Sequence, residues 1–341
     1  MQAVIATPES DATMGPLTEN NSLYKLPVGN RTLIEHTVAT LEEIGVDEIT
    51  INITSNAVRR IFGADRGVDR VETESSTIYF ARSRDPMTAG LDDEEPFLYV
   101  RGDYLYDSDQ LAALTEHDAA VGIVKSREGA HGSVTVKSGS VDDANPGNVP
   151  RTGNASAYAY WFPRQAHEWN YGVDPMLVEL SHNYQPAAVD MGDSWQPIRY
   201  PHQLLHANIA EAGDRDELKE SADVATTAAT SDVVVGENVT IGPSATVKNA
   251  VLMDGVTVES GAYVSDTIVA QDGRIGPNVS TSVHRGDGRA VTLEWSGSKI
   301  NTDLDRFGSV IGARANLMAG STALAGSMIS TGLTVSPGQI Q

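Results

Sequence analysis

The sequence predicts two domains of different class: an α/β domain with a mostly parallel sheet, followed by a parallel β-helix of hexapeptide repeats. The first half, residues 1–212, alternates strand-like and helix-like segments. The second, residues 233–341, carries an aliphatic side chain at about every sixth position. The length of 341 residues also exceeds the usual size of a domain with a single hydrophobic core. Between the halves, residues 213–232 are polar, with no bulky side chain after Leu218, and are expected to form a linker.

Four segments of the first half define its expected sheet and helix. Short apolar and β-branched runs predict strands, and apolar residues at helical spacing predict a helix. The predicted strands are residues 2–7, 48–53 and 96–100, and the predicted helix is residues 33–44. In sheets of this kind a ligand lies beyond the carboxyl ends of the strands, here in the loops after Ile5 and Val100.

The second half repeats with a regular spacing. Aliphatic positions follow at intervals of six, six and five, so that each coil advances by 17 residues. These positions are Val235, Ile241, Val247, Leu252, Val258, Val264, Val269 and Ile275, followed after an interruption by Ile311, Leu317, Ala323, Met328 and Thr334. Such spacing, with Gly, Pro or Asn between, builds triangular coils with aliphatic side chains stacked inside. A sandwich of short strands is the alternative, and the preserved spacing disfavours it.

An insertion, residues 282–309, interrupts the repeat. Residues 291–295 are typical of a strand, Ser296 and Gly297 of a turn, and residues 299–301 of the returning strand. We expect a hairpin that projects from the coil.

The composition excludes several classes of protein. With 46 acidic and 24 basic residues the net charge is −22, which disfavours binding to nucleic acid or to a membrane surface. The absence of cysteine excludes disulfides, thiolate catalysis and cysteine-ligated zinc. No apolar run is long enough for a signal or a membrane span, so a cytoplasmic protein is expected. Only 6 of the basic residues are Lys, and this depletion beside the acid excess favours a halophilic protein over an ordinary solvated surface.

Several segments, in this order, resemble sugar-1-phosphate nucleotidyltransferases of the glucose-1-phosphate thymidylyltransferase type. They are residues 16–18, 26–31, 33–36, 87–90, 96–103, 154–158 and 195–208. Together with the coil and its insertion they are similar to archaeal two-domain proteins that join such a domain to a left-handed β-helix acyltransferase. The resemblance implies a Rossmann-like domain in residues 1–212, a left-handed β-helix in residues 233–341, and a homo-oligomer, since such coils commonly form trimers.

The family joins an NTP to a sugar-1-phosphate and releases pyrophosphate. The partners implied are therefore a nucleotide and a sugar phosphate, with Mg²⁺ on the phosphates. By resemblance, the site residues are Lys25 as the catalytic cation, Thr88, Ala89, Gly102 and Asn154 as substrate-binding residues, and Asp103 as the metal ligand.

The phosphate-binding parts depart from the family pattern. The loop of residues 7–15 lacks the paired glycines and the Arg of the family, and Glu9 and Asp11 place negative charge where the triphosphate would lie. A Glu-Lys-Pro segment of the family appears here as residues 148–150, Asn-Val-Pro, without its cation.

The positions of the catalytic cation and of the second metal ligand also differ from the family pattern. The family's Lys falls on Leu23, and Lys25 would return to the same face only if the segment is extended. The second metal carboxylate falls on Pro197, with Asp190 and Asp193 as the nearby replacements. We therefore expect nucleotidyl transfer to be reduced or lost.

The β-helix half shows a similar loss. Acyl transfer needs a base near the acceptor amine, and His284 lies near the family's insertion histidine, although Gly286 is an alternative alignment. Gly320 stands where the relatives have Asn, so acetyl transfer is not expected. Two classes of function stay open: an enzyme making a nucleotide-sugar, and a non-catalytic protein that binds a nucleotide-sugar or serves as a regulatory or scaffold subunit of an active paralogue.

Overall fold

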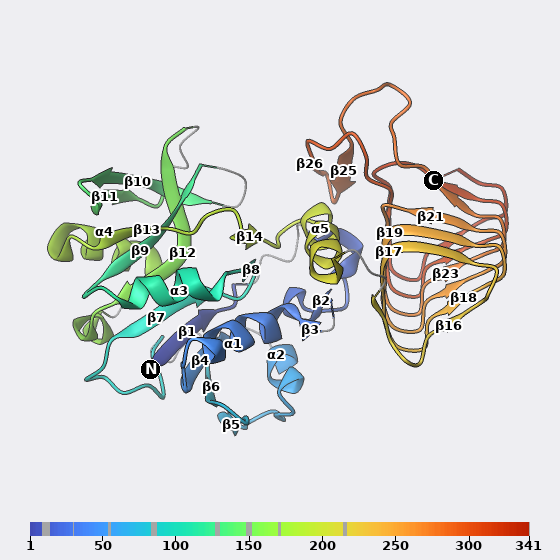
Figure 1. The fold of residues 1–341 in the computed structure, drawn as a ribbon. Coiled ribbons are helices and arrows are strands. Elements are labelled where there is room, and N and C mark those ends of the chain that lie inside the picture. The colour runs from blue at the N-terminus through green and yellow to red at the C-terminus, as the bar shows by residue number, and fades with distance from the viewer. Residues whose placement is uncertain are drawn as a thin grey trace. The chain divides into compact units, whose positions relative to one another are not determined.

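The computed structural model divides the chain into two compact units (Figure 1). The first unit contains Met1–Glu9 and Leu33–Pro197, and the second contains Ser10–Thr32 and Ile198–Gln341. The structure describes residues 1–8, 14–29, 31–53, 56–82, 87–126, 130–147, 152–169, 172–213 and 217–340.

The first unit is built on a ten-stranded mixed sheet with the order β10-β11-β13-β9-β12-β7-β1-β4-β6-β5. Its strands are β1 Gln2–Ala6, β4 Glu48–Ile53, β5 Arg70–Glu72, β6 Thr77–Arg82, β7 Phe97–Arg101, β9 Ala120–Lys125, β10 His131–Lys137, β11 Ser140–Asn145, β12 Asn154–Phe162 and β13 Ala187–Asp190, with a separate pair β8 Tyr104–Leu105 and β14 Gln196–Pro197. Its helices are α1 Leu33–Glu43, α2 Asn56–Ile61, α3 Ser108–Thr115, α4 Val173–Tyr184 and the 3-10 helix η4 Arg164–Glu168.

The sheet is less parallel than expected. Strand β1 pairs in parallel with β4 and β7, as the sequence predicts, but β12 lies antiparallel between β7 and β9. Ala3, Val4 and Ile5 of β1 are fully buried. Helices pack on the sheet, α3 against β9, β12 and β13, and α2 against β4. The α/β class of this half is confirmed.

The second unit begins with a segment that the sequence places in the first domain. Residues 14–29 hold the 3-10 helices η2 Gly15–Leu17 and η3 Leu23–Lys25 and the short strand β2 Pro27–Val28, which pairs with β3 Arg31–Thr32. Helix α5 Pro201–Ala212 packs against β2 and also against β17 and β19 of the coil.

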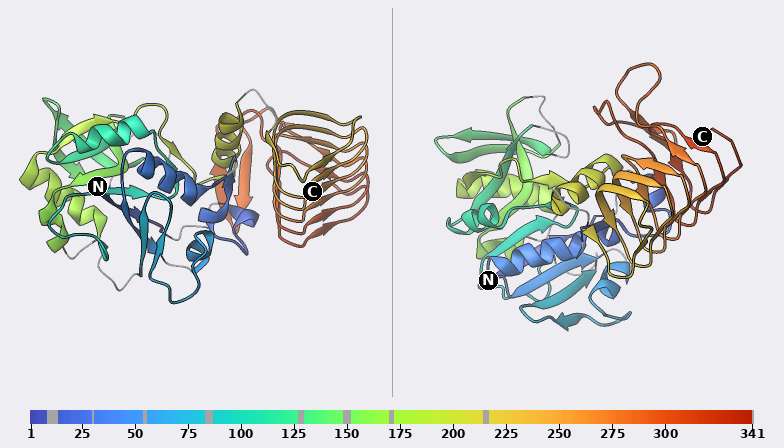
Figure 2. Two further views of the ribbon diagram at one scale, coloured as in Figure 1. Left: turned by 60° about the horizontal axis from the view of Figure 1, so that its bottom comes forward. Right: turned by 45° about the vertical axis from the view of Figure 1, so that its right-hand side comes forward.

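The coil consists of short parallel strands stacked in ladders, which Figure 2 shows from two further directions. Its strands are β15 Glu217–Leu218, β16 Asp223–Val224, β17 Ala229–Val235, β18 Thr240–Ile241, β19 Thr246–Leu252, β20 Thr257–Val258, β21 Tyr263–Ser265, β22 Ile268–Val269, β23 Arg274–Ile275, β24 Ser280–Thr281, β27 Val310–Ile311, β28 Asn316–Leu317, β29 Thr322–Ala323, β30 Met328–Ile329 and β31 Thr334–Val335. The predicted aliphatic positions from Val235 to Ala323 lie in one buried core.

Two expectations about the coil are corrected. Residues 217–232, expected to be part of a linker, form its first turn, because β15, β16 and β17 pair in parallel with the turn that follows. The predicted advance of 17 residues per turn holds from Val235 to its partner Leu252. In the last turn Ile311 pairs with Ile329, which is an advance of 18 residues. The last turn keeps three full hexads, so Ile329 and Val335 fill the core in place of Met328 and Thr334.

The expected hairpin in the insertion is confirmed. Strands β25 Thr292–Trp295 and β26 Ser298–Asn301 pair antiparallel. Ser296 and Gly297 both have positive φ, 49° and 79°, as a tight two-residue hairpin turn requires. Within the described residues, no helix has the length and apolar character to cross a bilayer.

Candidate functional site

The carboxyl end of β7 lies at the centre of the sheet of the first unit. Arg101, the last residue of β7, is opposite Ala6 of β1, and the Gly102 amide donates to the Ala6 carbonyl at 2.9 Å. Gly102 is buried, and Asp103 follows it directly. The predicted substrate residue Gly102 and metal residue Asp103 therefore lie at the strand ends where the fold places a ligand.

Both carboxylate oxygens of Asp103 are engaged by Arg101. The Arg101 guanidinium donates from Nε to Oδ1 at 2.7 Å and from Nη2 to Oδ2 at 2.5 Å, a bidentate ion pair. The side chain of Asp103 is 0% exposed and that of Arg101 10%. Burial alone would lower the pKa of Arg101, but the hydrogen bonds and the charge of Asp103 hold it well above its usual range.

Aromatic rings enclose this pair. The guanidinium carbon lies 4.5 Å from the centre of the Tyr158 ring and 5.3 Å from that of Tyr104, within the range of cation–π attraction. Trp195 is 1% exposed, packs on Tyr104 and donates to the Ala157 carbonyl at 2.9 Å. The space around the end of β7 is therefore filled by side chains of this chain.

Hydrogen bonds and a stacked ring hold Tyr158 in place. Tyr158 has φ +54°, at a register shift in β12, and its amide donates to the Ser156 hydroxyl at 3.1 Å. The His131 ring stacks on Tyr158 at 4.3 Å, and its Nε2 lies 2.9 Å from Oδ1 of Asp174. The Tyr106 hydroxyl donates to the Tyr158 carbonyl at 3.0 Å and accepts from the Arg101 amide at 3.2 Å. Ser156 and Tyr158 belong to the family-like segment 154–158, whereas Tyr106, His131 and Asp174 were not identified from the sequence.

The donors around Asp103 do not fit Mg²⁺, which takes six oxygen ligands in octahedral geometry. Pairing of β14 with β8 sets Pro197, the position of the second carboxylate, opposite Tyr104. Asp190 is exposed and accepts from the Gly192 amide at 3.0 Å, and Asp193 is also exposed. The described part of the chain contains no group of three or more His, Asp or Glu that could hold a metal. The assignment of Asp103 as a metal ligand stays a prediction.

Two of the predicted substrate-binding residues, Thr88 and Ala89, lie in a turn fixed to β4. The Thr50 hydroxyl donates to the Ala89 carbonyl at 2.8 Å, and the Thr88 carbonyl accepts from the Leu91 amide at 3.0 Å. A hollow of about 370 Å³ lies beside this turn; its lining is Asp69, Tyr79, Phe80, Ala81, Arg82, Ala89 and Gly90. Gly90 has φ +93°, and a Cβ there would lie 2.5 Å from the Tyr79 ring, so glycine is required.

The remaining predicted residues lie in other elements. Asn154 begins β12, where its side-chain oxygen accepts from Lys125 at 3.0 Å. Lys25 lies in the second unit and ends η3, so the extended segment that would have brought it to the face of Leu23 is not present. Leu23 is fully buried, whereas Lys25 is partly exposed. Glu9, Asp11 and residues 148–150 lie outside the described part of the chain.

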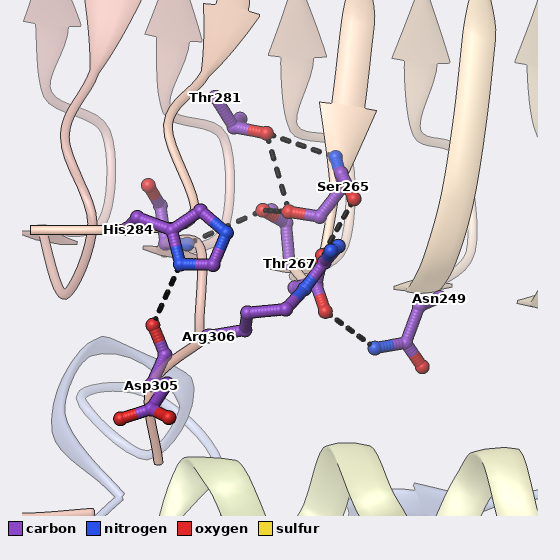
Figure 3. A network of polar contacts seen from close by, with 9 residues as sticks. Asn249, Ser265, Thr267, Thr281, His284, Asp305 and Arg306 are labelled. Atoms are coloured by element: carbon purple, nitrogen blue, oxygen red, sulfur yellow. Dashed lines mark hydrogen bonds and ion pairs between the residues drawn. The ribbon is translucent and has the colours of Figure 1, made fainter. Parts of the chain in front are cut away.

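In the second unit, a polar network joins the insertion to the coil (Figure 3). Asp266, 5% exposed and with φ +51°, accepts hydrogen bonds from Arg306 at 2.9 Å, the Ser265 hydroxyl at 2.6 Å and Asn249 at 2.7 Å. A Cβ at Gly308 would lie 2.4 Å from the Ser265 carbonyl oxygen, so only glycine allows the insertion to return this close.

The candidate acyl-transfer histidine belongs to the same network. His284 is hydrogen-bonded through Nδ1 to the Asp305 carbonyl at 2.9 Å, and neighbouring Arg285 forms a bidentate pair with Asp287. Gly320 lies in a coil turn with open space around it. The contact of His284 with Asp305 lies within the insertion, so His284 stabilises the conformation of the insertion.

Acid unfolding should depend on Asp266. Burial alone would raise its pKa, but the bonds from Arg306, Ser265 and Asn249 hold it below the ordinary value of 3.8. The folded state then binds fewer protons than the unfolded state, so this stabilisation is complete above pH 3.8 and is lost as the pH falls through the folded pKa. Asp266→Asn should lower stability at neutral pH and flatten its fall in this acid window, measured by urea unfolding at several pH values. Asp303→Asn, at an exposed aspartate with φ +54°, is the control; an equal flattening there would contradict the assignment.

Comparison with known proteins found relatives for parts of the chain. Residues 217–332 match the family described as the GMPPB C-terminal domain. Over 104 residues the chain is 31% identical to an uncharacterized acetyltransferase, YaiX, of Escherichia coli O6:K15:H31, a match that covers 30% of this chain and 45% of that protein. Over 81 residues it is 32% identical to the bifunctional protein GlmU of Methanococcus vannielii, covering 24% of this chain and 19% of that one. The chain thus spans less than half the length of these relatives.

A solved structure also resembles the chain. A protein described as a glucose-1-phosphate thymidylyltransferase from Bacillus anthracis superposes with a TM-score of 0.50 at 13% identity, over 62% of this chain and 95% of that one. At this identity the likeness concerns the fold alone.

Proposed function

We propose that this chain is a sugar-1-phosphate nucleotidyltransferase-type protein that binds a nucleotide and a sugar phosphate and whose transfer activity is reduced or lost. The pairing of β14 with β8 carries the proposal. It sets Pro197 against Tyr104, so the position of the family's second metal carboxylate carries no carboxylate side chain here. Without a second ligand, the charge that develops on the phosphates in the transition state lacks a metal to neutralise it.

Other parts of the proposal rest on the family likeness and on composition. We infer that the coil winds in the left-handed sense and that the chain forms a homo-oligomer, with a trimer as the leading form. We also infer that the net charge of −22 is an adaptation to a halophilic cytoplasm. Base and sugar would contact the turn at Thr88 and Ala89 and the start of β12 at Asn154.

A regulatory or scaffold subunit of an active paralogue is the second candidate. The filling of the ligand end of β7 by Arg101, Tyr104 and Tyr158 favours it, since a subunit that only docks needs no open pocket.

Calorimetric titration with NTPs and nucleotide-sugars in molar KCl tests the first candidate. We expect saturable binding that weakens in Asn154→Ala, while pyrophosphate release from NTP and sugar-1-phosphate stays at background. Glu168→Ala, at an exposed residue of η4, is the matched control and should bind as the wild type does. Pyrophosphate release at an ordinary turnover would overturn the loss of transfer, and an absence of any ligand would favour the scaffold.

A further inference from the structure

Arg101 and Asp103 lie close together at the carboxyl end of β7. Arg101 ends β7, and Asp103 lies two residues further on, in the turn that joins β7 to β8, so the guanidinium is within reach of this carboxylate. The Arg101 backbone is itself fixed, because its amide donates to the Tyr106 hydroxyl at 3.2 Å. The contact between the two side chains is therefore set by local geometry and by a buried anchor.

The charge of the pair is balanced internally. A guanidinium stays protonated at all accessible pH values, and its fork of N–H donors matches the two oxygens of a carboxylate. Both oxygens of Asp103 receive such a donor, and the guanidinium carbon lies 4.5 Å from the centre of the Tyr158 ring. Asp103 thus has the counter-charge that a metal would otherwise supply.

A divalent ion could reach Asp103 only by displacing this arrangement. Arg101 would have to leave the Tyr104 and Tyr158 rings, and its positive charge would then lie beside the metal. The ion would also lose most of its hydration shell at a side chain that is 0% exposed, and Pro197 offers no side-chain ligand in return.

We propose that Arg101 is a built-in cation that occupies the place of the divalent metal at Asp103. This rests on the family relation proposed above. The first unit then keeps its charge balance without Mg²⁺, and whatever anionic ligand it takes binds independently of divalent ions.

Metal-dependent melting tests the proposal without any assay of activity. Melting temperatures are measured with and without Mn²⁺ at constant ionic strength in molar KCl, for the wild type, Arg101→Ala, and Arg101→Ala with Asp103→Asn. Mn²⁺ should leave the wild type unchanged, raise the melting temperature of Arg101→Ala saturably, and leave the double variant unchanged. Glu94→Ala, which breaks the exposed pair with Arg164, is the control for non-specific binding of cations to an acidic surface.

Two results would overturn the proposal. One is a saturable rise in the wild type that Asp103→Asn abolishes, because Asp103 would then bind metal despite Arg101. The other is an Arg101→Ala protein that no divalent ion stabilises. If Arg101→Ala fails to fold, Arg101→Gln, which keeps N–H donors but no charge, takes its place under the same expectations, and the electron paramagnetic resonance signal of Mn²⁺ titrated with the wild type gives a second reading. Ligand binding with transfer intact would contradict the proposed function and leave these melting results unaffected.

Discussion

Asp103→Ala should lower the free energy of unfolding of the first unit by about 3–5 kcal/mol. The cost is large because Arg101 stays buried and charged after its counter-ion is removed, and the rings of Tyr104 and Tyr158 that lie against it carry no net charge. Its Nε and Nη2 donors also lose their acceptors. Urea unfolding followed by tryptophan fluorescence measures the change, since buried Trp195 packs on Tyr104 and reports on this region.

The matched control is Glu94→Ala. Glu94 pairs with Arg164 at 2.5 Å in the same unit, but the two side chains are 75% and 56% exposed. Water screens such a pair, so its removal should cost no more than about 1 kcal/mol. If Asp103→Ala costs as little as this control, the buried pair is not a major support of the first unit.

The sequence predicted the elements whose cause is local. The repeat of the coil follows from one aliphatic residue in six, and the hairpin follows from a two-residue turn at Ser296 and Gly297, so both are present as expected. The error at Met328 has a local cause too: Met328 and Ile329 are both apolar, and only the pairing of Ile311 with Ile329 decides which one enters the core.

The site was less predictable because it depends on contacts between distant segments. Their separation of two residues could have indicated that Arg101 and Asp103 lie near each other, although Asp103 lies in the turn after β7. Nothing in the sequence indicates that Tyr158 adopts a left-handed φ, or that His131 stacks on it. A motif identifies the residue that a family uses for metal, but tertiary packing decides whether that residue has oxygens left to ligate.

The second large effect is expected at Asn208 of α5. Its side chain is fully buried and makes three hydrogen bonds: Oδ1 accepts from the Gly29 amide at 2.9 Å, and Nδ2 donates to the carbonyls of Pro27 at 2.8 Å and Leu204 at 2.9 Å. One amide thereby ties the turn after β2 to a helix 179 residues further along the chain.

Asn208→Ala leaves the buried Gly29 amide and the partly buried Pro27 carbonyl without this partner. Each unsatisfied group costs about 1–3 kcal/mol, so the second unit should lose several kcal/mol in urea unfolding followed by circular dichroism. Asn208→Asp separates the two kinds of bond, since a carboxylate can still accept from Gly29 but cannot donate to Pro27; it should be no more stable than the alanine variant because it also buries a charge. Asn301→Ala, at an exposed amide of the hairpin bonded to Asp303, is the control and should change stability by no more than about 0.5 kcal/mol. Equal effects at Asn208 and Asn301 would mean that β2 is held to α5 by packing alone.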